Sequence, residues 1–420
     1  MALLSLKRSP RVTGAAVVLL LAFVAAGSWV GWKLWRRSQN YHRPPPVIAG
    51  ADRPLLPTTG PAPPTPTETM HAEQAPGVRV ETVLSDLQIV WDICFAPDGR
   101  MFFTERPGRV RVLRPGQSRP DTFAEVPTVL GGESGLMGIA LHPQFPTEPY
   151  VYVMYTARKR GGGVNRVSRF TDDAGRGRDE QVLLDDIPSA RNHDGGAIEF
   201  GPDGMLYVGT GDANVPYIAQ DLSHPNGKVL RLAPDGKVPP DNPFPGSAVW
   251  AYGFRNISGL SFHPGTGELW AASHGPSSNL PGEPKYMDSV YVVQKGRNHG
   301  WPLHLGVSND GQFVSPVLFW PDEAIPPGGS MFYAGGMFPK FKGNYLMTSL
   351  RSELMHRVDV GPGNSIRAIE RWWPQKYGRL RAIAHGPDGA IYVGTSNRDG
   401  RTDRSYPGSD FIYRLVPDAK

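Results

Sequence analysis

The sequence has a single cysteine, Cys94, among its 420 residues. A lone cysteine cannot close a disulfide within the chain, so the fold has no disulfide framework. The sequence also lacks a Cys/His cluster with metal-site spacing, a phosphate-binding glycine loop and a serine at a nucleophile elbow. We therefore do not expect a zinc module, a P-loop nucleotide-binding domain or a serine hydrolase of that type.

Excess charge of one sign is also scarce. The chain has 44 Lys and Arg against 39 Asp and Glu, a net charge of +5, and much of the basic excess lies near the N-terminus. This balance excludes the basic surface of a nucleic-acid-binding protein. Apolar residues make up 40% of the chain, enough for a large core, and the 50 Gly and 43 Pro suit many turns between short strands.

One long hydrophobic run is present, close to the N-terminus. Residues 1–11 form a basic N-terminal region. Residues 12–32 follow as an apolar run of about 20 positions, near the length that crosses a bilayer. They predict a transmembrane anchor, with a cleaved signal sequence as the alternative. Residues 33–77 predict a proline-rich, extended linker. Residues 78–420 would then form a membrane-anchored periplasmic or extracytoplasmic domain, or a secreted one after signal cleavage.

Helical periodicity is almost absent from residue 78 onward, and one short phrase repeats instead. Each copy has alternating apolar residues, a turn such as Pro-Asp-Gly and a second apolar run, which is typical of a β-hairpin. Clear copies span residues 93–106, 198–212, 260–276 and 383–400, a looser copy spans 139–156, and a sixth candidate spans 338–350. One sheet of about four strands per copy, repeated around an axis, is a β-propeller. The sequence therefore predicts an all-β, six-bladed β-propeller.

A histidine stands directly before a glycine pair in the stretch RNHDGG, residues 191–196. The glycines would allow backbone or a ligand to come close to His193. Propellers bind ligands on the axial face, where each blade contributes a loop, and His193 lies in such a loop. From these residues alone, His193 is either a base above a bound molecule or a residue that caps a turn.

Several longer phrases occur in a fixed order through the domain: GGESGLMGIALHPQF, NHDGGAIEFGPDGMLYVGTGD, AYGFRNISGLSFHPGTGELWAASHGP, KGRNHGWP and GRLRAIAHGPDGAIYVGT. Together they resemble the quinoprotein glucose/sorbosone dehydrogenases, which are soluble-type aldose dehydrogenases that use pyrroloquinoline quinone (PQQ). The resemblance implies a six-bladed propeller with PQQ and Ca²⁺ as cofactors. It also implies oxidation of an aldose sugar at C1 to a lactone, with an external quinone or cytochrome as the electron acceptor.

The resemblance assigns roles to individual positions. His193 becomes the general base, and Arg255 stabilises the negative charge that forms as hydride is transferred. The binding positions are Glu133 and Asn192 for the sugar, Asn256, Arg351, Arg379 and Arg381 for PQQ, and the backbone carbonyls of Gly275 and Pro276 for calcium.

The sequence departs from the family pattern in several places, including Ala382, which stands where an acid is common. Glu133 replaces the usual glutamine and adds a negative charge near His193, which we expect to slow the histidine as a base at neutral pH. Asn192 stands where glucose dehydrogenases have an aspartate that supports the base. The segment around Asp288 lacks the acid and the amide found in relatives, which argues against a second, structural calcium site there.

Two other functions remain open for such a propeller. A calcium-dependent lactonase would need several inward-facing carboxylates around an axial calcium, whereas the candidates here are mostly Arg, Asn and His. A non-catalytic propeller that binds a glycan or a protein would be expected to have lost the arginines, which are present. The sequence therefore favours the sugar dehydrogenase.

Overall fold

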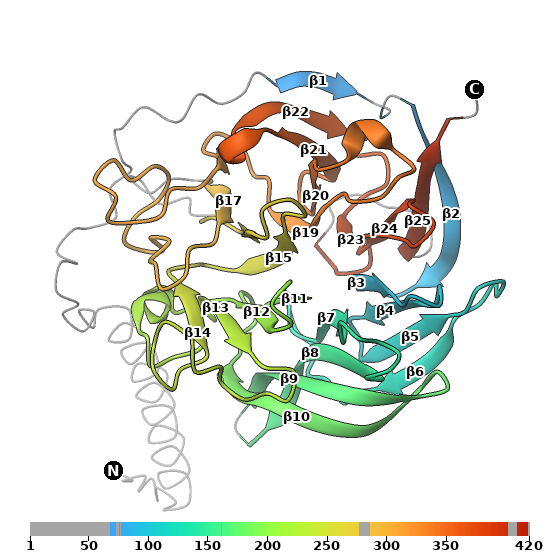
Figure 1. Cartoon of the computed structure of the whole chain (residues 1–420), viewed down its shortest axis with the longest axis horizontal. Helices are drawn as coiled ribbons and strands as arrows, with labels where there is room; N and C mark the ends of the chain where they lie inside the picture. Colours follow the sequence, from blue (N-terminus) through green and yellow to red (C-terminus); the bar gives the residue numbers. More distant parts are fainter. Residues whose placement is uncertain are drawn as a thin grey trace, which may run out of the picture. The chain divides into compact units, whose positions relative to one another are not determined.

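The computed structural model describes residues 68–72, 75, 77–160, 162–276, 286–401 and 410–418. Their strands form six sheets that follow one another around a central axis (Figure 1). The predicted all-β, six-bladed propeller is confirmed. The predicted anchor or signal, residues 12–32, lies outside the described residues. In the part of the chain that is described, no helix is long and apolar enough to cross a membrane.

The first three blades are four-stranded and run outward from the axis. Blade 1 consists of β3 (Val90–Phe95), β4 (Met101–Glu105), β5 (Arg109–Leu113) and β6 (Asp121–Glu125). Blade 2 consists of β7 (Leu136–Leu141), β8 (Tyr150–Lys159), β9 (Gly162–Asp173) and β10 (Arg176–Pro188). Blade 3 consists of β11 (Gly195–Phe200), β12 (Leu206–Thr210), β13 (Lys228–Leu232) and β14 (Val249–Tyr252).

The last three blades include strands from both ends of the described chain. Blade 4 consists of β15 (Ile257–Phe262), β16 (Leu269–Ser273), β17 (Asp288–Val292) and β18 (Leu318–Trp320). Blade 5 consists of β19 (Pro327–Phe332), β20 (Tyr345–Ser349), β21 (Leu354–Val360), β22 (Ile366–Trp372) and β1 (Glu68–Ala72). Blade 6 consists of β23 (Leu380–His385), β24 (Ile391–Thr395), β25 (Asp410–Pro417) and β2 (Val78–Leu87). Short 3-10 helices η1 (Pro216–Gln220), η2 (Pro339–Phe341) and η3 (Pro362–Asn364) lie in loops.

The repeated phrases form the two inner strands of the blades. Five of them match hairpins such as β3–β4 and β11–β12, and the sixth, residues 338–350, instead contains η2 and β20. The turn aspartates act locally: a side-chain oxygen accepts a backbone N–H two residues on in Asp98, Asp203 and Asp388. These aspartates serve the hairpins and not a ligand.

The hydrophobic core lies between neighbouring blades. The second strands of four blades, β4, β12, β16 and β20, are buried at every position, because the adjacent blades cover both faces of each sheet. Phe102 of β4, for example, packs in one cluster with Leu136 and Tyr155 of blade 2. The first strands contact one another in turn around the axis, from β3 to β23 and back. The loops at one end of these first strands therefore face a common space on the axis.

The ring is closed by strands from opposite ends of the domain. β2 pairs antiparallel with β25, from Val78 opposite Pro417 to Leu87 opposite Asp410. The buried Asp410 carboxylate accepts the backbone N–H of Ile89 at 2.7 Å and the hydroxyl of Thr395 at 2.9 Å. This carboxylate links the start of blade 1 to two strands of blade 6.

A strand within the predicted linker joins the propeller. β1 pairs in parallel with the outer strand β22, with Glu68 opposite Ile369 and Ala72 opposite Trp372. Parallel pairing adds this segment to blade 5 as a fifth strand. Proline content indicates an extended chain, but it gives no sign of the sheet edge to which the chain is bound.

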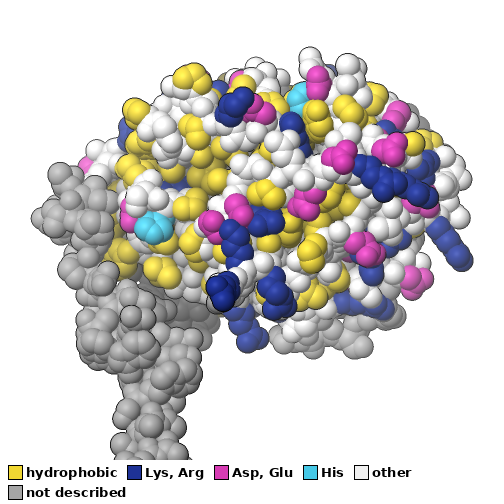
Figure 2. All heavy atoms as spheres, turned by 90° about the horizontal axis from the view of Figure 1, so that it is seen from below, with side chains coloured by type: hydrophobic (Ala, Val, Ile, Leu, Met, Phe, Trp, Pro, Cys, Tyr) yellow, Lys and Arg dark blue, Asp and Glu magenta, His cyan; other side chains and the backbone are white. Residues whose placement is uncertain are grey.

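The side of the propeller carries charges of both signs. Figure 2 shows Lys and Arg interspersed with Asp and Glu. Ion pairs include Arg100–Asp172, between blades 1 and 2, and Arg166–Asp185, between β9 and β10. Mixed charge of this kind favours solubility over binding of a polyanion.

We expect Asp410→Asn to lower the free energy of unfolding by roughly 2–4 kcal/mol, because an amide cannot accept all of the donors that surround this buried carboxylate. Urea denaturation monitored by tryptophan fluorescence would measure the loss. Asp235→Asn is the matched control, since Asp235 forms an exposed pair with Lys237 and should change stability by less than about 0.5 kcal/mol. Equal effects of the two substitutions would contradict a clamp at Asp410.

Candidate functional site

Loops at one end of the axis line a cavity of about 770 Å³. Six predicted site residues line it, namely Glu133, Asn192, His193, Arg255, Arg351 and Arg379. The other four predicted residues do not. Asn256 and Arg381 are buried, and Gly275 lies in a small adjoining pocket that shares Arg255 and His274 with the main cavity.

His193 is held in a strained loop just before β11. Its φ is +67°, a value that side-chain-bearing residues rarely adopt, and Gly195 and Gly196 follow with φ of +72° and +122°. A Cβ on Gly195 would approach the Gly209 carbonyl oxygen to 2.5 Å, and one on Gly196 would approach Trp91 to 2.7 Å. The glycine pair is therefore required for the loop to pack against its own hairpin and β3.

The imidazole of His193 is oriented by Asp212. Nδ1 of His193 lies 2.7 Å from Oδ1 of Asp212, whose side chain is fully buried and whose Oδ2 accepts the indole N–H of Trp301 at 2.8 Å. A carboxylate at Nδ1 holds the proton there and leaves Nε2 as the acceptor. His193 lines the cavity, and an imidazole held in this tautomer is suited to accept a proton.

Sequence analysis missed Asp212, although a signal for it exists. Gly195 pairs with Thr210 in the β11–β12 hairpin, and extending that register by two residues sets His193 opposite Asp212. The support for the base, expected at the neighbouring position occupied by Asn192, therefore comes from across the hairpin. The amide oxygen of Asn192 instead accepts a hydrogen bond from Arg401.

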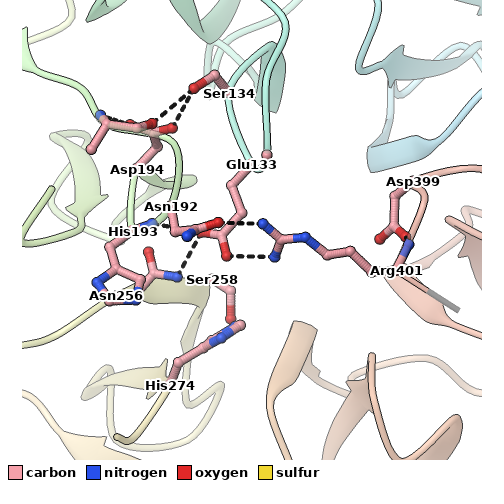
Figure 3. Close-up of polar contacts among 12 residues, drawn as sticks. Glu133, Ser134, Asn192, His193, Asp194, Asn256, Ser258, His274, Asp399 and Arg401 are labelled. Carbon is pink, nitrogen blue, oxygen red and sulfur yellow. Dashed lines mark hydrogen bonds and ion pairs between the residues drawn. The ribbon is translucent and has the colours of Figure 1, made fainter. Parts of the chain in front are cut away.

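Glu133 lies at the centre of a network that includes the His193 backbone (Figure 3). Its Oε2 accepts the backbone N–H of His193 at 2.8 Å and the amide of Asn256 at 3.1 Å. Its Oε1 accepts Nη1 of Arg401 at 2.9 Å. Burial raises the pKa of Glu133, but His274, His193 and Arg401 outweigh this effect and lower it to about 2. Glu133 is thus ionised, and its charge is paired with Arg401 and is not left alone beside the base.

Asn256 acts within the protein scaffold. Its Oδ1 accepts the backbone N–H of Gly195 at 2.8 Å while its Nδ2 donates to Glu133. Only 3% of the residue is exposed. Both ends of the amide are therefore committed to the His193 loop and its neighbour, and the predicted contact with PQQ remains a prediction.

Two arginines of the cavity wall have no acidic partner among the described residues. Arg255 places its guanidinium 5.5 Å from the centre of the Trp301 ring, and Arg351 is exposed in the loop after β20. Burial lowers the pKa of Arg255, with Asp212 the strongest of the acids that oppose this shift. An unpaired, largely buried guanidinium that lines a cavity is suited to bind an anionic ligand.

Arg379 and Arg381 lie in two different environments. Nε of Arg379 is 2.8 Å from Oδ2 of Asp399, and Arg379 still lines the cavity. Arg381 stacks 5.4 Å from the centre of the Trp91 ring, and its Nε is buried with no hydrogen-bond partner in the described part of the chain. Burial lowers the pKa of Arg381 to about 10. Arg381 thus lies behind the cavity wall, against the neighbouring inner strand.

The backbone at Gly275, which precedes Pro276, is held by Asp288. Oδ1 of Asp288 accepts the backbone N–H of Gly275 at 2.8 Å, and Oδ2 accepts that of Ile325 at 2.8 Å. A Cβ on Gly275 would meet the Met287 carbonyl oxygen at 2.4 Å. Within the described ranges, no group of three acidic, His or Cys side chains is placed to hold a metal ion. Any cation here would therefore depend on backbone oxygens.

The site places a histidine–aspartate pair and unpaired arginines around one axial cavity of a six-bladed propeller. Such a site is suited to hold an anionic small molecule beside a histidine that can accept a proton. A sequence model of the Glucose / Sorbosone dehydrogenase family matches residues 87–404. The chain belongs to that family.

Relatives with named activities span most of the propeller. An aldose sugar dehydrogenase of Escherichia coli is 30% identical over 77% of this chain and 91% of its own length. Quinoprotein glucose dehydrogenase B of Acinetobacter calcoaceticus is 30% identical over 56% of this chain and 54% of its own length. The PQQ-bound structure of an aldose sugar dehydrogenase from Streptomyces coelicolor has 31% identity and a TM-score of 0.71, covering 81% of this chain and 98% of that one.

We expect Asp212→Asn to lower turnover in a dye-coupled sugar oxidation assay by roughly 10²- to 10⁴-fold. The asparagine amide can donate to Nδ1 and so move the imidazole proton to Nε2, where it blocks proton acceptance. Asp221→Asn is the matched control, because Asp221 forms an Asp–His pair of similar geometry with His224 on the surface. The role of Asp212 would be refuted if both variants kept wild-type turnover.

Proposed function

We propose that this protein is a PQQ-dependent aldose dehydrogenase that oxidises the sugar at C1 to a lactone. The observation that carries the proposal is the pairing of His193 with Asp212 in the same cavity as the unpaired Arg255. A base that accepts a proton and a cation that stabilises negative charge are the two groups that removal of hydride from a sugar requires. Membership of the dehydrogenase family and the PQQ-bound relative support it.

The cavity fits PQQ in charge and size. PQQ carries three carboxylates, and the cavity wall includes Arg255, Arg351 and Arg379, of which only Arg379 has a carboxylate partner among the described residues. A volume of about 770 Å³ is within the range of small-molecule sites. Arg255 and Arg351 would hold carboxylates or the reacting carbonyl, with Arg379 beside them. When bound, PQQ supplies the two-electron acceptor for hydride.

Calcium fits the loop at Gly275 and Pro276. Ca²⁺ prefers oxygen ligands and accepts backbone carbonyls. Asp288 fixes the backbone of this loop, and the close approach of Met287 leaves no room for a side chain on Gly275. The carbonyls of Gly275 and Pro276 would hold the ion next to the cavity and add positive charge there.

The chain's own groups then perform the proton transfer. Nε2 of His193 accepts the proton of the C1 hydroxyl, while Asp212 stabilises the imidazolium that forms. Glu133 accepts the backbone N–H of His193 and so fixes the position of the imidazole in the cavity. Arg255, whose guanidinium has no competing carboxylate among the described residues, stabilises negative charge as it develops.

The alternative functions lack a comparable observation. A lactonase centred on calcium needs several carboxylates directed into the axial space. The described cavity wall has only Glu133 and Glu353 as acids, and Glu133 is paired with Arg401. A non-catalytic binding propeller does not require an oriented His–Asp pair.

The cellular arrangement is a further part of the proposal. Residues 12–32 would anchor the chain with the propeller on the periplasmic or extracytoplasmic side, or would be removed from a secreted form. An anchor would keep the propeller close to a membrane quinone or a cytochrome that accepts the electrons. The support is the hydrophobic run in the sequence and its proline-rich continuation.

The test is a titration of the full-length, cofactor-free protein with PQQ in the presence of calcium, followed by dye reduction with a panel of aldoses. We expect activation at one PQQ per chain, and loss of at least about 10²-fold in turnover for His193→Ala with PQQ binding retained. Failure to bind PQQ at micromolar concentration would overturn the arginine and calcium assignments together. Activity in His193→Ala equal to wild type would remove the proposed base.

A further inference from the structure

Arg401 extends from blade 6 past blade 1 to the loop that precedes blade 2. It follows β24 in blade 6, and its side chain extends to Glu133, in the loop that leads into blade 2 (Figure 3). Nη1 of Arg401 is 2.9 Å from Oε1 of Glu133, and Nη2 donates to the amide oxygen of Asn192. Arg401 thus contacts both residues assigned to the sugar, directly beside His193.

Arg401 is held in this position by a buried acid. Oδ1 of Asp399 accepts the backbone N–H of Arg401 at 2.9 Å, and Oδ2 of the same carboxylate binds Nε of Arg379 at 2.8 Å. The side chain of Asp399 is 1% exposed. The placement of Arg401 is therefore tied to an arginine that lines the same cavity, and it is not a chance surface contact.

Glu133 and Arg401 form one unit because three donors meet at the Glu133 carboxylate. His193 N–H and the Asn256 amide share Oε2, and Arg401 takes Oε1. A glutamine at position 133 would have only one acceptor oxygen. Its NH₂ group would face one of these three donors, with which it cannot form a hydrogen bond as an acceptor. With both residues charged, the pair is neutral as a whole.

We propose that the Glu133–Arg401 pair determines the specificity of the sugar site and restricts it to neutral aldoses. This inference rests on the proposed function and names its substrate class. A sugar with C1 at Nε2 of His193 places its other hydroxyls toward Asn192, Glu133 and Arg401, which accept from and donate to them. A carboxylate on the sugar would be repelled by Glu133, and an ammonium would be repelled by Arg401. The residue of opposite charge offers no compensating attraction, because Glu133 and Arg401 are already paired with each other.

The experiment measures kcat/KM of the PQQ-loaded, full-length enzyme for glucose, glucuronate and glucosamine, at a pH where the amino group is protonated. In Glu133→Gln, the freed Arg401 should raise the glucuronate-to-glucose ratio about tenfold. In Arg401→Gln, the freed Glu133 should raise the glucosamine-to-glucose ratio by a similar factor. The double variant Glu133→Gln/Arg401→Gln should return both ratios to those of the wild type.

Comparing two sugars within one variant removes any loss of turnover caused by disturbance of His193. Glu81→Gln is the matched control, because Glu81 forms a 2.9 Å pair with Arg414 on the closing blade, away from the cavity. It should leave both ratios unchanged. If Glu133→Gln does not fold, Arg401→Gln, whose side chain is 34% exposed, decides the question through glucosamine alone.

The outcomes separate this inference from the function on which it rests. Ratios that stay within twofold of wild type in variants that bind PQQ and oxidise glucose would overturn the specificity role and leave the dehydrogenase intact. A wild-type enzyme that binds no PQQ and oxidises no sugar would overturn both. Opposite shifts in the two single variants, cancelled in the double variant, would establish the pair.

Discussion

The pairing of β2 with β25 is the contact on which the remaining structure depends. Asp410 of β25 binds the backbone of Ile89, 321 positions earlier in the chain, and so joins the first and last blades. The cavity is lined by loops from around the ring, so its geometry exists only while the ring is closed. If blades 1 and 6 separated, Glu133 and Arg401 would no longer face one another. The geometry of the cavity therefore depends on the contacts that close the ring between blades 6 and 1.

The centre of the molecule contains two kinds of charged group. Asp212, Glu133 and Asp399 each have a specific partner, and these pairs hold the imidazole, the His193 loop and Arg379 in place. Arg255 and Arg351 have no acidic partner among the described residues and line the cavity. Paired charges cost little once their hydrogen bonds are complete, whereas an unpaired buried guanidinium is unfavourable until an anion arrives. An anion bound at Arg255 would therefore supply the partner that the described residues do not.

Much of the fold could be predicted because five of the six blades begin with a local signal. A Pro-Asp-Gly turn between apolar runs forms a hairpin through contacts a few residues apart, as the turn aspartates Asp98 and Asp203 show. Asp212 was missed but was within reach, because the hairpin register that pairs Gly195 with Thr210 extends to it. Arg401 was not within reach: its partner Glu133 is 268 positions away, and only the closed ring brings the two together. The β1–β22 pairing was hidden for the same reason.

The sequence by itself determined the hairpins, the number of blades and the strained glycine loop that carries His193, because turn chemistry and strand alternation act over short stretches of chain. Tertiary structure alone decided which charges are paired. From the sequence, Glu133 is an unfavourable charge beside a base, whereas in the structure it is paired with Arg401 of blade 6. From the sequence, Arg381 is expected to bind the same ligand as Arg379, whereas in the structure it packs against Trp91. The pKa and role of an ionisable group depend on neighbours within a few ångströms, and in a closed propeller those neighbours come from opposite ends of the chain.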